Sequence, residues 1–224
     1  MKIYFVRHGH PDYSKNCLTE LGHKQAAAAA LSLKNSGIEQ IFASSYGRAI
    51  ETAEHTADIL GLEVIPCDFM KEIAWGSIDD QPILEAGHPW RLSTVFASEG
   101  KSLTDFNWRQ KEPFCKSKVV ASSNVVIAGL DAWLEGLGYK REGEYYRVGE
   151  NTPKVVAMFS HGGSSSVAFS HLFNIPFPQI CGMFRIDFTG IAVVELPDKP
   201  GELVYPILRS LDESHLVGIE AENT

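Results

Sequence analysis

A run of four apolar residues near the start of the chain, Ile3 to Val6, constrains the fold more than any other stretch. Short continuous apolar runs are typical of strands buried on both faces, which occur in parallel sheets covered by helices. The run leads directly into Arg7, His8 and Gly9. Because ligands bind at the carboxyl ends of strands in open α/β sheets, we expect Arg7 and His8 at a binding site. A surface loop that carries these residues by chance is the competing interpretation of this stretch alone.

The segments that follow alternate between helix and strand. Thr19 is a good N-cap for one helix, and Gly61 is a suitable C-terminal cap for the next. Strand, helix, strand, helix, strand is the order of a doubly wound sheet. We therefore predict a three-layer α/β fold: a mostly parallel, doubly wound sheet with helices on both faces and an inserted cap. The predicted elements of this half are strands at 3–6, 41–43 and 62–66 and helices at 19–37 and 46–60.

The second half of the chain returns to this alternation after a less regular stretch. We treat residues 1–224 as a single domain in which residues 77–150 form a cap insertion over the active site, because no linker rich in Gly, Ser or Pro brackets them. The tail from Asp212 is acidic, and we expect it to be frayed. The predicted elements are helices at 116–137 and 164–173, a hairpin at 139–148, and strands at 155–159, 184–188, 191–196 and 204–208.

Charge and cysteine content exclude several kinds of partner. The net charge of −8 argues against a general affinity for nucleic acid or anionic membranes, because both need a basic face. A few arginines can still form a local pocket for a small anionic substrate. The four cysteines are scattered, without the spacing of a zinc site. Only a short apolar run precedes Arg7, so we expect neither a signal peptide nor a membrane span, and a cytoplasmic location.

Histidines follow the two most strand-like segments of the chain. His8 follows the first strand, and His161 follows the apolar run 155–159. Parallel strands end at the same edge of a sheet, so the two imidazoles meet if these strands are neighbours. Two such pairs could also arise by chance, but their position at the two best buried strands favours a common site.

A cation and a helix start are predicted at the same edge. Arg48 comes shortly after the strand at 41–43 and in the first turn of a helix, where it opposes the helix dipole. Gly162 opens another helix, whose free N–H groups form a natural anion site. An exposed arginine and an ordinary helix start are the alternatives. With Arg7, these groups suit a tetrahedral phosphoryl group with several oxygens.

These residues occur in an order that resembles a known family. The ordered set is Arg7-His8-Gly9, Leu18-Thr19 with Gly22 and Gln25-Ala26, Ser44 to Arg48-Ala49 with Thr52-Ala53, Glu72-Ile73 before Gly76, and Ser160-His161-Gly162-Gly163. In this order the chain is similar to the histidine phosphatase superfamily, the phosphoglycerate-mutase-like group. The resemblance covers residues 3–76 and 154–208 and leaves the predicted cap unmatched.

The resemblance implies a phosphohistidine mechanism. His8 would attack phosphorus, and Arg7, Arg48 and His161 would bind the phosphoryl oxygens. Gly162, at the start of its predicted helix, is a further candidate for phosphate binding. No metal or other cofactor is implied, because the cationic side chains supply the charge. The implied ligand is a small phosphorylated metabolite or inorganic phosphate.

The general acid is the least secure of the implied roles. Glu72 would protonate the leaving oxygen and later deprotonate the attacking water. Carboxylates further along the chain, Asp79, Asp80 and Glu85, could reach the same pocket and are alternatives to Glu72.

The chain departs from the family pattern in ways that favour a phosphatase over a mutase. His10 stands where Glu is commonest in the family, and Ser14 stands where mutases carry a substrate-contacting Asn. His10 and Asn16 are possible substrate contacts. The segment after Glu72 lacks the aromatic and basic residues of true mutases.

Two other functions compete with this one. His8, His10 and Asp12 match an H-x-H-x-D pattern, whose spacing can present several ligands to zinc in a metallohydrolase. Against a metal, Arg7 and Arg48 would repel a cation. A non-catalytic binding module is the third class, although it would normally have lost one of the four core groups. In the predicted cap, further candidates for substrate contact are Arg91, Arg109, Lys116, Lys118, His88, Trp90 and Trp108.

Overall fold

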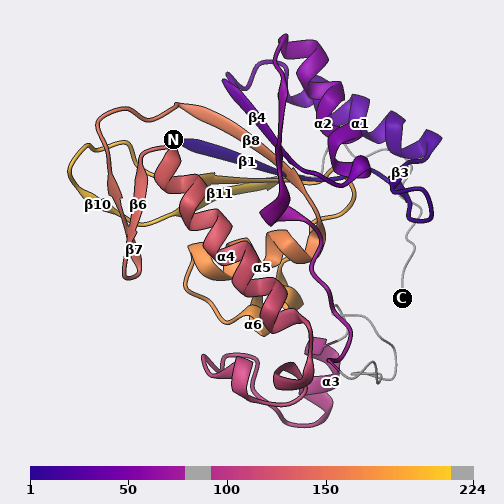
Figure 1. Ribbon diagram of the computed structural model, residues 1–224, viewed down its shortest axis with the longest axis vertical. Coiled ribbons are helices and arrows are strands. Elements are labelled where there is room, and N and C mark those ends of the chain that lie inside the picture. Colours follow the sequence, from indigo (N-terminus) through magenta and orange to yellow (C-terminus); the bar gives the residue numbers. More distant parts are fainter. Residues whose placement is uncertain (79–91, 213–224) are drawn as a thin grey trace.

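The computed structural model describes residues 1–78 and 92–212, and a six-stranded sheet forms its centre (Figure 1). Four neighbouring strands of the sheet are parallel to one another, and β9 is antiparallel to β1 and β11. The mostly parallel α/β sheet predicted from the sequence is therefore confirmed. In spatial order the strands are β11 (Ile207–Asp212), β9 (Ile191–Glu195), β1 (Lys2–Arg7), β8 (Val155–Ser160), β4 (Gln40–Ser44) and β5 (Val64–Cys67).

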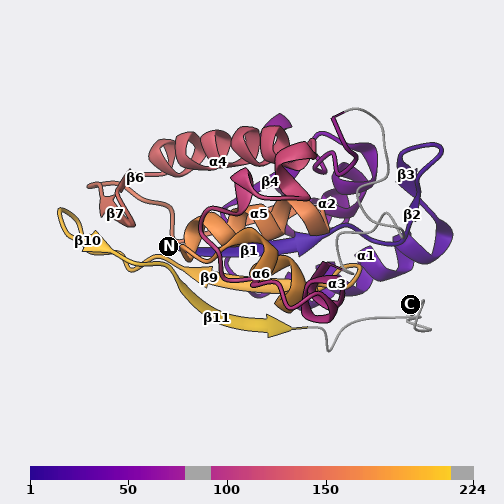
Figure 2. The ribbon, with the colours of Figure 1, turned by 90° about the horizontal axis from the view of Figure 1, so that it is seen from below.

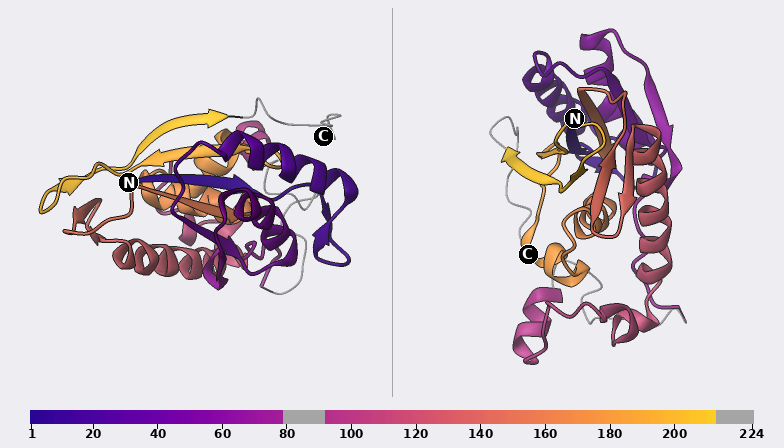
Figure 3. Two further views of the ribbon diagram at one scale, coloured as in Figure 1. Left: turned by 90° about the horizontal axis from the view of Figure 1, so that it is seen from above. Right: turned by 90° about the vertical axis from the view of Figure 1, so that its left-hand side faces the viewer.

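The side chains of the central strands alternate between two separate hydrophobic cores, because successive residues of a strand face opposite sides of the sheet. On one face, Ile3 and Phe5 join a large core with Phe169. On the other face, Val6 joins a smaller core with Ala53. Figures 2 and 3 show the resulting helix layers. They are α1 (Glu20–Leu33) and α2 (Gly47–Leu60) on the smaller core, and α4 (Val119–Gly136), α5 (Gly162–Leu172) and α6 (Phe177–Met183) on the larger one.

Local capping explains where the first two helices begin and end. The Thr19 hydroxyl accepts a hydrogen bond from the backbone N–H of Gly22, as its N-cap role requires. Gly61 ends α2 in a left-handed conformation, at φ 67°, and its N–H donates to the carbonyl of Ala57. Both predicted caps are confirmed. Between β1 and α1, Pro11–Asp12 (β2) and Cys17–Leu18 (β3) form a small antiparallel pair.

The predicted hairpin is confirmed as β6 (Tyr139–Glu142) and β7 (Tyr145–Val148), with Gly143 in the turn at φ 63°. The strand predicted at 204–208 is instead two short strands, β10 (Leu203–Val204) beside β7 and β11 beside β9. Pro206 separates them, since proline has no N–H to donate to a ladder.

The strand predicted at 184–188 is wrong: these described residues form no strand and leave α6 as an irregular segment. Its alternation of apolar and charged residues imitates a strand. The backbone is used differently, however, because the carbonyl of Ile186 accepts a hydrogen bond from Arg7 and the N–H of Gly190 closes a turn onto the carbonyl of Asp187. This segment lies against the carboxyl end of β1 instead of extending the sheet.

The described part of the predicted cap divides into three kinds of structure. Helix α4 packs in the large core, where Val126, Leu130 and Leu134 are buried. Before α4, α3 (Leu92–Ser98) and the short 3₁₀ turns at 108–110 and 114–116 lie to one side of α6. After α4, the β6–β7 hairpin pairs with β10. The cap over residues 77–150 stays a prediction, since residues 79–91 lie outside the described ranges. Within residues 1–78 and 92–212, no helix combines the length and hydrophobicity needed to cross a membrane.

Candidate active site

The backbone that carries His8 is fixed by contacts with three other segments. The N–H of His8 donates to the carbonyl of Ser160 on β8 (2.9 Å), and the N–H of Gly9 donates to Thr52 Oγ1 on α2 (3.0 Å). A Cβ at Gly9 would lie 2.6 Å from the carbonyl oxygen of Gly22, so only glycine fits there. His8 is thereby held at the end of the central strand.

His8 is 1% exposed and has a defined tautomer. Its Nδ1 lies 2.7 Å from the carbonyl oxygen of Gly9, which can only accept, so Nδ1 carries the hydrogen. Nε2 therefore carries a lone pair, and Arg48 Nε donates a hydrogen bond to it at 3.3 Å. Burial, assisted by the charge of Arg7, holds the pKa of His8 well below its usual value. The ring is thus a neutral base with an available nitrogen, as a nucleophile requires.

Arg48 comes from the first turn of α2 and is 6% exposed. Besides the bond to His8, its Nη1 donates to Asn16 Oδ1 at 2.7 Å. Asn16 adopts φ 55°, which brings its side chain back over the start of α2. The sequence therefore predicted two residues that the structure brings into contact. Burial lowers the pKa of the Arg48 guanidinium, and the carboxylate of Glu72 raises it.

Arg7 is held from the side of the irregular segment after α6. Its Nη1 donates to the carbonyl of Ile186 at 2.9 Å, and its guanidinium carbon lies 4.2 Å from the centre of the Phe188 ring. This distance is typical of a cation–π contact. Its Nε is buried without a hydrogen-bond partner in the part of the chain that the structure describes. A guanidinium with an unused donor beside His8 suits an anionic ligand.

His161 follows β8 and is fully buried. Because β8 pairs in parallel with β1, opposite Arg7 at Ser160, its ring centre lies 5.0 Å from that of His8. The predicted adjacency of the two strands is confirmed. Its Nε2 lies 2.8 Å from Ser44 Oγ. Burial and the neighbouring His8 hold the pKa of His161 well below its usual value.

Glu72 occupies the start of α5. Its Oε1 accepts from the N–H of Ser164 (3.0 Å) and its Oε2 from the N–H of Gly163 (3.3 Å). A Cβ at Gly163 would lie 2.5 Å from Oε1, so the glycine makes room for the carboxylate. Two of the helix N–H groups that we expected to be free for an anion therefore bind Glu72. Phosphate binding at Gly162 stays a prediction.

His10 and Asp12 are each held by a neighbouring hydroxyl group. His10 Nδ1 pairs with Thr19 Oγ1 at 2.9 Å, and the His10 ring lies 5.6 Å from Phe188. Asp12 accepts from Ser14 in an exposed turn. The described residues contain no group of three or more His, Cys, Asp or Glu suited to a metal. These residues do not fit the H-x-H-x-D metal centre.

Sequence reasoning gave no role to three residues that contact the site: Ser44, Thr52 and Phe188. Ser44 and Thr52 lie within the motif that carries the resemblance, so a signal was present. No sequence signal pointed to a site role for Phe188, because its segment was interpreted as a strand. The alternative acids Asp79, Asp80 and Glu85, and the cap residues His88, Trp90 and Arg91, lie outside the described residues.

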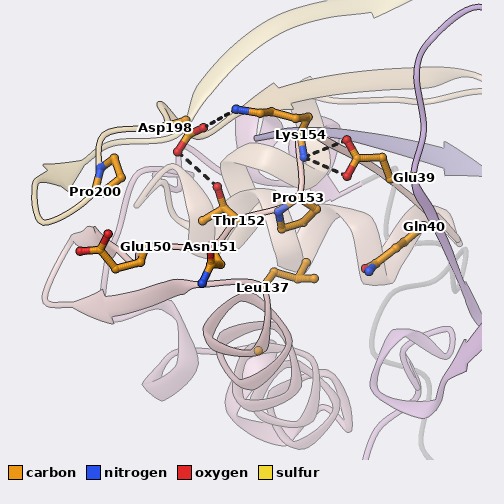
Figure 4. A pocket seen from close by; sticks show the side chains of 11 residues that line it. Glu39, Gln40, Leu137, Glu150, Asn151, Thr152, Pro153, Lys154, Asp198 and Pro200 are labelled. Atoms are coloured by element: carbon orange, nitrogen blue, oxygen red, sulfur yellow. Dashed lines mark hydrogen bonds and ion pairs between the residues drawn. The ribbon is translucent and has the colours of Figure 1, made fainter.

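A cavity of about 580 Å³ opens at the other end of the sheet (Figure 4). Lys154, just before β8, pairs there with Asp198 at 3.0 Å, and its backbone N–H lies 3.3 Å from the carboxylate of Glu39. It lies at the amino ends of the parallel strands, whereas His8 and His161 follow their carboxyl ends. This cavity is separate from the histidine site.

Solved structures of similar fold come from several phosphatases. A phosphoserine phosphatase from Entamoeba histolytica, in complex with 3-phosphoglyceric acid, has a TM-score of 0.60 at 20% identity, over 96% of this chain and 99% of that chain. A mycobacterial glucosyl-3-phosphoglycerate phosphatase with inorganic phosphate has a TM-score of 0.61 at 20% identity, over 97% and 99%. An alpha-ribazole phosphatase from Shigella flexneri has a TM-score of 0.60 at 18% identity, over 98% and 100%. At these identities the likeness concerns the fold.

Curated relatives match a shorter part of the sequence. A probable phosphoglycerate mutase GpmB from Yersinia pestis (strain Pestoides F) is 30% identical over 117 residues, which are 47% of this chain and 54% of the relative. The chain thus spans about half the length of the curated relatives it matches. A family model matches residues 3–128, more than half of the 224 residues. By this match, the chain belongs to the histidine phosphatase superfamily (branch 1).

Proposed function

We propose that the protein is a metal-independent phosphatase that hydrolyses a small phosphorylated metabolite through a phosphohistidine at His8. The observation that carries the proposal is the state of the His8 ring. The Gly9 carbonyl fixes the hydrogen on Nδ1, which leaves Nε2 as a buried lone pair beside Arg48 and His161. A neutral nucleophile flanked by donors suits attack on an anionic phosphoryl group.

In the first step, His8 Nε2 forms a bond to phosphorus and the phosphorus–oxygen ester bond breaks. Arg7 and Arg48 offset the charge that spreads over the non-bridging oxygens, and the neutral His161 ring donates a hydrogen bond to one of them. Protonated Glu72 gives its proton to the leaving oxygen, so that an alcohol departs. The amides of Gly163 and Ser164 in α5 hold the Glu72 carboxyl in place, and the charges of Glu72 and of both arginines influence one another.

In the second step, water attacks phosphorus and the phosphorus–nitrogen bond breaks. Glu72, now a carboxylate, takes a proton from the water, and His8 Nε2 recovers its lone pair. Inorganic phosphate leaves, and the enzyme returns to its starting state. Because the side-chain cations hold the phosphoryl oxygens in both steps, the reaction as proposed needs no divalent metal.

A mutase differs only in what accepts the phosphoryl group from His8. The curated relatives named as probable phosphoglycerate mutases keep this alternative open. Solved neighbours named as phosphatases, together with the residues that follow Glu72, support hydrolysis. Phosphoglycerate interconversion faster than phosphate release would overturn the phosphatase proposal.

The test is hydrolysis of p-nitrophenyl phosphate in excess EDTA by the wild type, His8→Ala and His23→Ala. His23 is an exposed residue of α1 and serves as the matched histidine control. We expect activity in the wild type and the control and none in His8→Ala. Acid-labile, base-stable labelling by radioactive substrate should follow the same pattern. Loss of activity with EDTA alone would contradict metal independence.

A further inference from the structure

His161 has one nitrogen engaged and one without a partner. Its Nε2 lies 2.8 Å from Ser44 Oγ, and its Nδ1 is buried with no hydrogen-bond partner among the described residues. A buried polar atom without a partner is costly, because it has lost water and gained nothing. An atom of this kind beside a catalytic ring suggests a ligand atom that is yet to bind.

The contacts of Ser44 distinguish the two neutral tautomers of His161. The hydroxyl oxygen accepts from the backbone N–H of Tyr46 at 3.4 Å, so its own hydrogen is available for Nε2. If Nε2 carried the hydrogen, Ser44 Oγ would receive two donors and its hydrogen would have no acceptor among the hydrogen bonds of the described residues. Donation from Ser44 to Nε2 satisfies the hydroxyl and leaves the hydrogen on Nδ1.

The fold holds this donor firmly. Ser44 is the last residue of β4, is fully buried, and lies opposite Cys67 in the parallel ladder with β5. The rings of Tyr46 and His161 form a T-shaped pair, with ring centres 5.4 Å apart and planes at 70°. The imidazole is thus constrained by a hydrogen bond at Nε2 and by an aromatic contact.

We propose that Ser44 is a positioning residue that donates to His161 Nε2, fixes the Nδ1–H tautomer and so aims a donor at a non-bridging oxygen of the phosphoryl group on His8. The identity of that ligand rests on the function proposed above; the tautomer does not. In the opposite tautomer, Nδ1 would present a lone pair to an anion and repel it. Ser44 therefore decides whether the buried nitrogen attracts or repels phosphate.

The test is the tautomer itself, measured by long-range ¹H–¹⁵N correlation spectra of histidine-labelled protein at pH 8 without ligand. His161→Gln assigns the signal by its loss. We expect Nδ1 protonated and Nε2 bare in the wild type. In Ser44→Ala, the population should move toward the Nε2–H form that free imidazole side chains prefer. A wild type with Nε2 protonated, or an unchanged tautomer in Ser44→Ala, would overturn the proposal.

Ser45→Ala is the matched control, because the hydroxyl of Ser45 donates to Asp68 instead. Thermal unfolding of both variants checks that Ser44→Ala is folded, and the wild-type spectrum remains decisive if it is not. Titration with inorganic phosphate should shift the Nδ1 hydrogen of the wild type, and Ser44→Ala should bind phosphate about tenfold more weakly.

The outcomes separate the two proposals. A Ser44-dependent Nδ1–H tautomer in a protein with no phosphatase activity would defeat the proposed function and leave the positioning role intact. Full phosphatase activity in a protein whose His161 has the Nε2–H tautomer would defeat the positioning role of Ser44 and leave the proposed function intact. A phosphate affinity that is equal in Ser44→Ala and the wild type would defeat the claim that the Nδ1 donor serves the anion.

Discussion

Arg48 donates from its Nε to His8 Nε2 across 3.3 Å, so the arginine holds the nitrogen that the proposed mechanism uses as its nucleophile. The same guanidinium reaches Asn16 through Nη1, which sets its plane. Once His8 Nε2 bonds to phosphorus, it can no longer accept from Arg48 Nε. A substrate oxygen must then accept that hydrogen bond. Arg48 is therefore placed to orient His8 before the reaction and to bind a phosphoryl oxygen during it.

Arg48→Lys tests this relationship. Lysine keeps the charge but cannot make the forked contact, so we expect kcat/KM to fall by about 10²–10³, the usual cost of a lost transition-state donor. Arg147→Lys, an exposed residue paired with Glu142 on the distant hairpin, should retain wild-type activity. A value of kcat/KM within threefold of wild type would mean that charge alone suffices at this position.

The two buried histidines predict a loss of stability in acid. Burial holds the pKa values of His8 and His161 below that of the unfolded chain, near 6.5, so the folded state binds fewer protons. Their contribution is complete above pH 6.5 and is lost as pH falls through 6.5 toward the folded pKa values. Each ring changes the free energy of unfolding by about 1.4 kcal/mol per pH unit in that window.

Urea unfolding at pH 7.5 and 5.5 measures this effect. The free energy of unfolding should fall more in the wild type than in the His8→Asn, His161→Asn double variant, which cannot take up these protons. His23→Asn, which changes an exposed ring, should behave like the wild type. If the free energy of unfolding fell equally in the wild type and the double variant, proton uptake by His8 and His161 would not explain the loss of stability in acid.

Gly163→Ala tests the position of Glu72. The new Cβ would lie 2.5 Å from Oε1 and 2.6 Å from a carbon of Ile73, so the carboxylate must move. We expect kcat to fall by about 10²-fold or more, in line with the usual contribution of a general acid. Gly136→Ala, near the end of α4, has nothing within 4 Å and should keep full activity. Wild-type kcat in Gly163→Ala would argue against Glu72 as the acid.

The sequence predicted the fold and the site best where both depend on local patterns. The buried strands, the caps at Thr19 and Gly61, and the placement of His8, His161 and Arg48 at one sheet edge all follow from local patterns. The position of Glu72 does not, because its carboxylate binds amides of Gly163 and Ser164, which lie far away in the sequence.

The segment from Phe184 to Phe188 shows the opposite case. Its alternation predicts a strand, but two contacts with Arg7 outweigh that preference, one through the Ile186 carbonyl and one through the Phe188 ring. Thr189 follows at φ 62°, an unfavourable conformation for a β-branched residue, and its N–H donates to the Arg7 carbonyl at 3.0 Å. Tertiary contacts of this kind leave no periodic signal.

Phe188→Leu tests whether this segment supports the site. The ring lies against the guanidinium of Arg7 and has its centre 5.5 Å from that of His8, so it shields both from water on one side. Leucine keeps apolar volume but loses the attraction between ring and cation, worth about 0.5–2 kcal/mol. We expect a fall of about tenfold in kcat/KM and weaker binding of inorganic phosphate, because Arg7 would lose its fixed position. Phe106→Leu, whose ring is 71% exposed, is the control. If Phe188→Leu and Phe106→Leu had equal kcat/KM, the Ile186 carbonyl alone would suffice to hold Arg7.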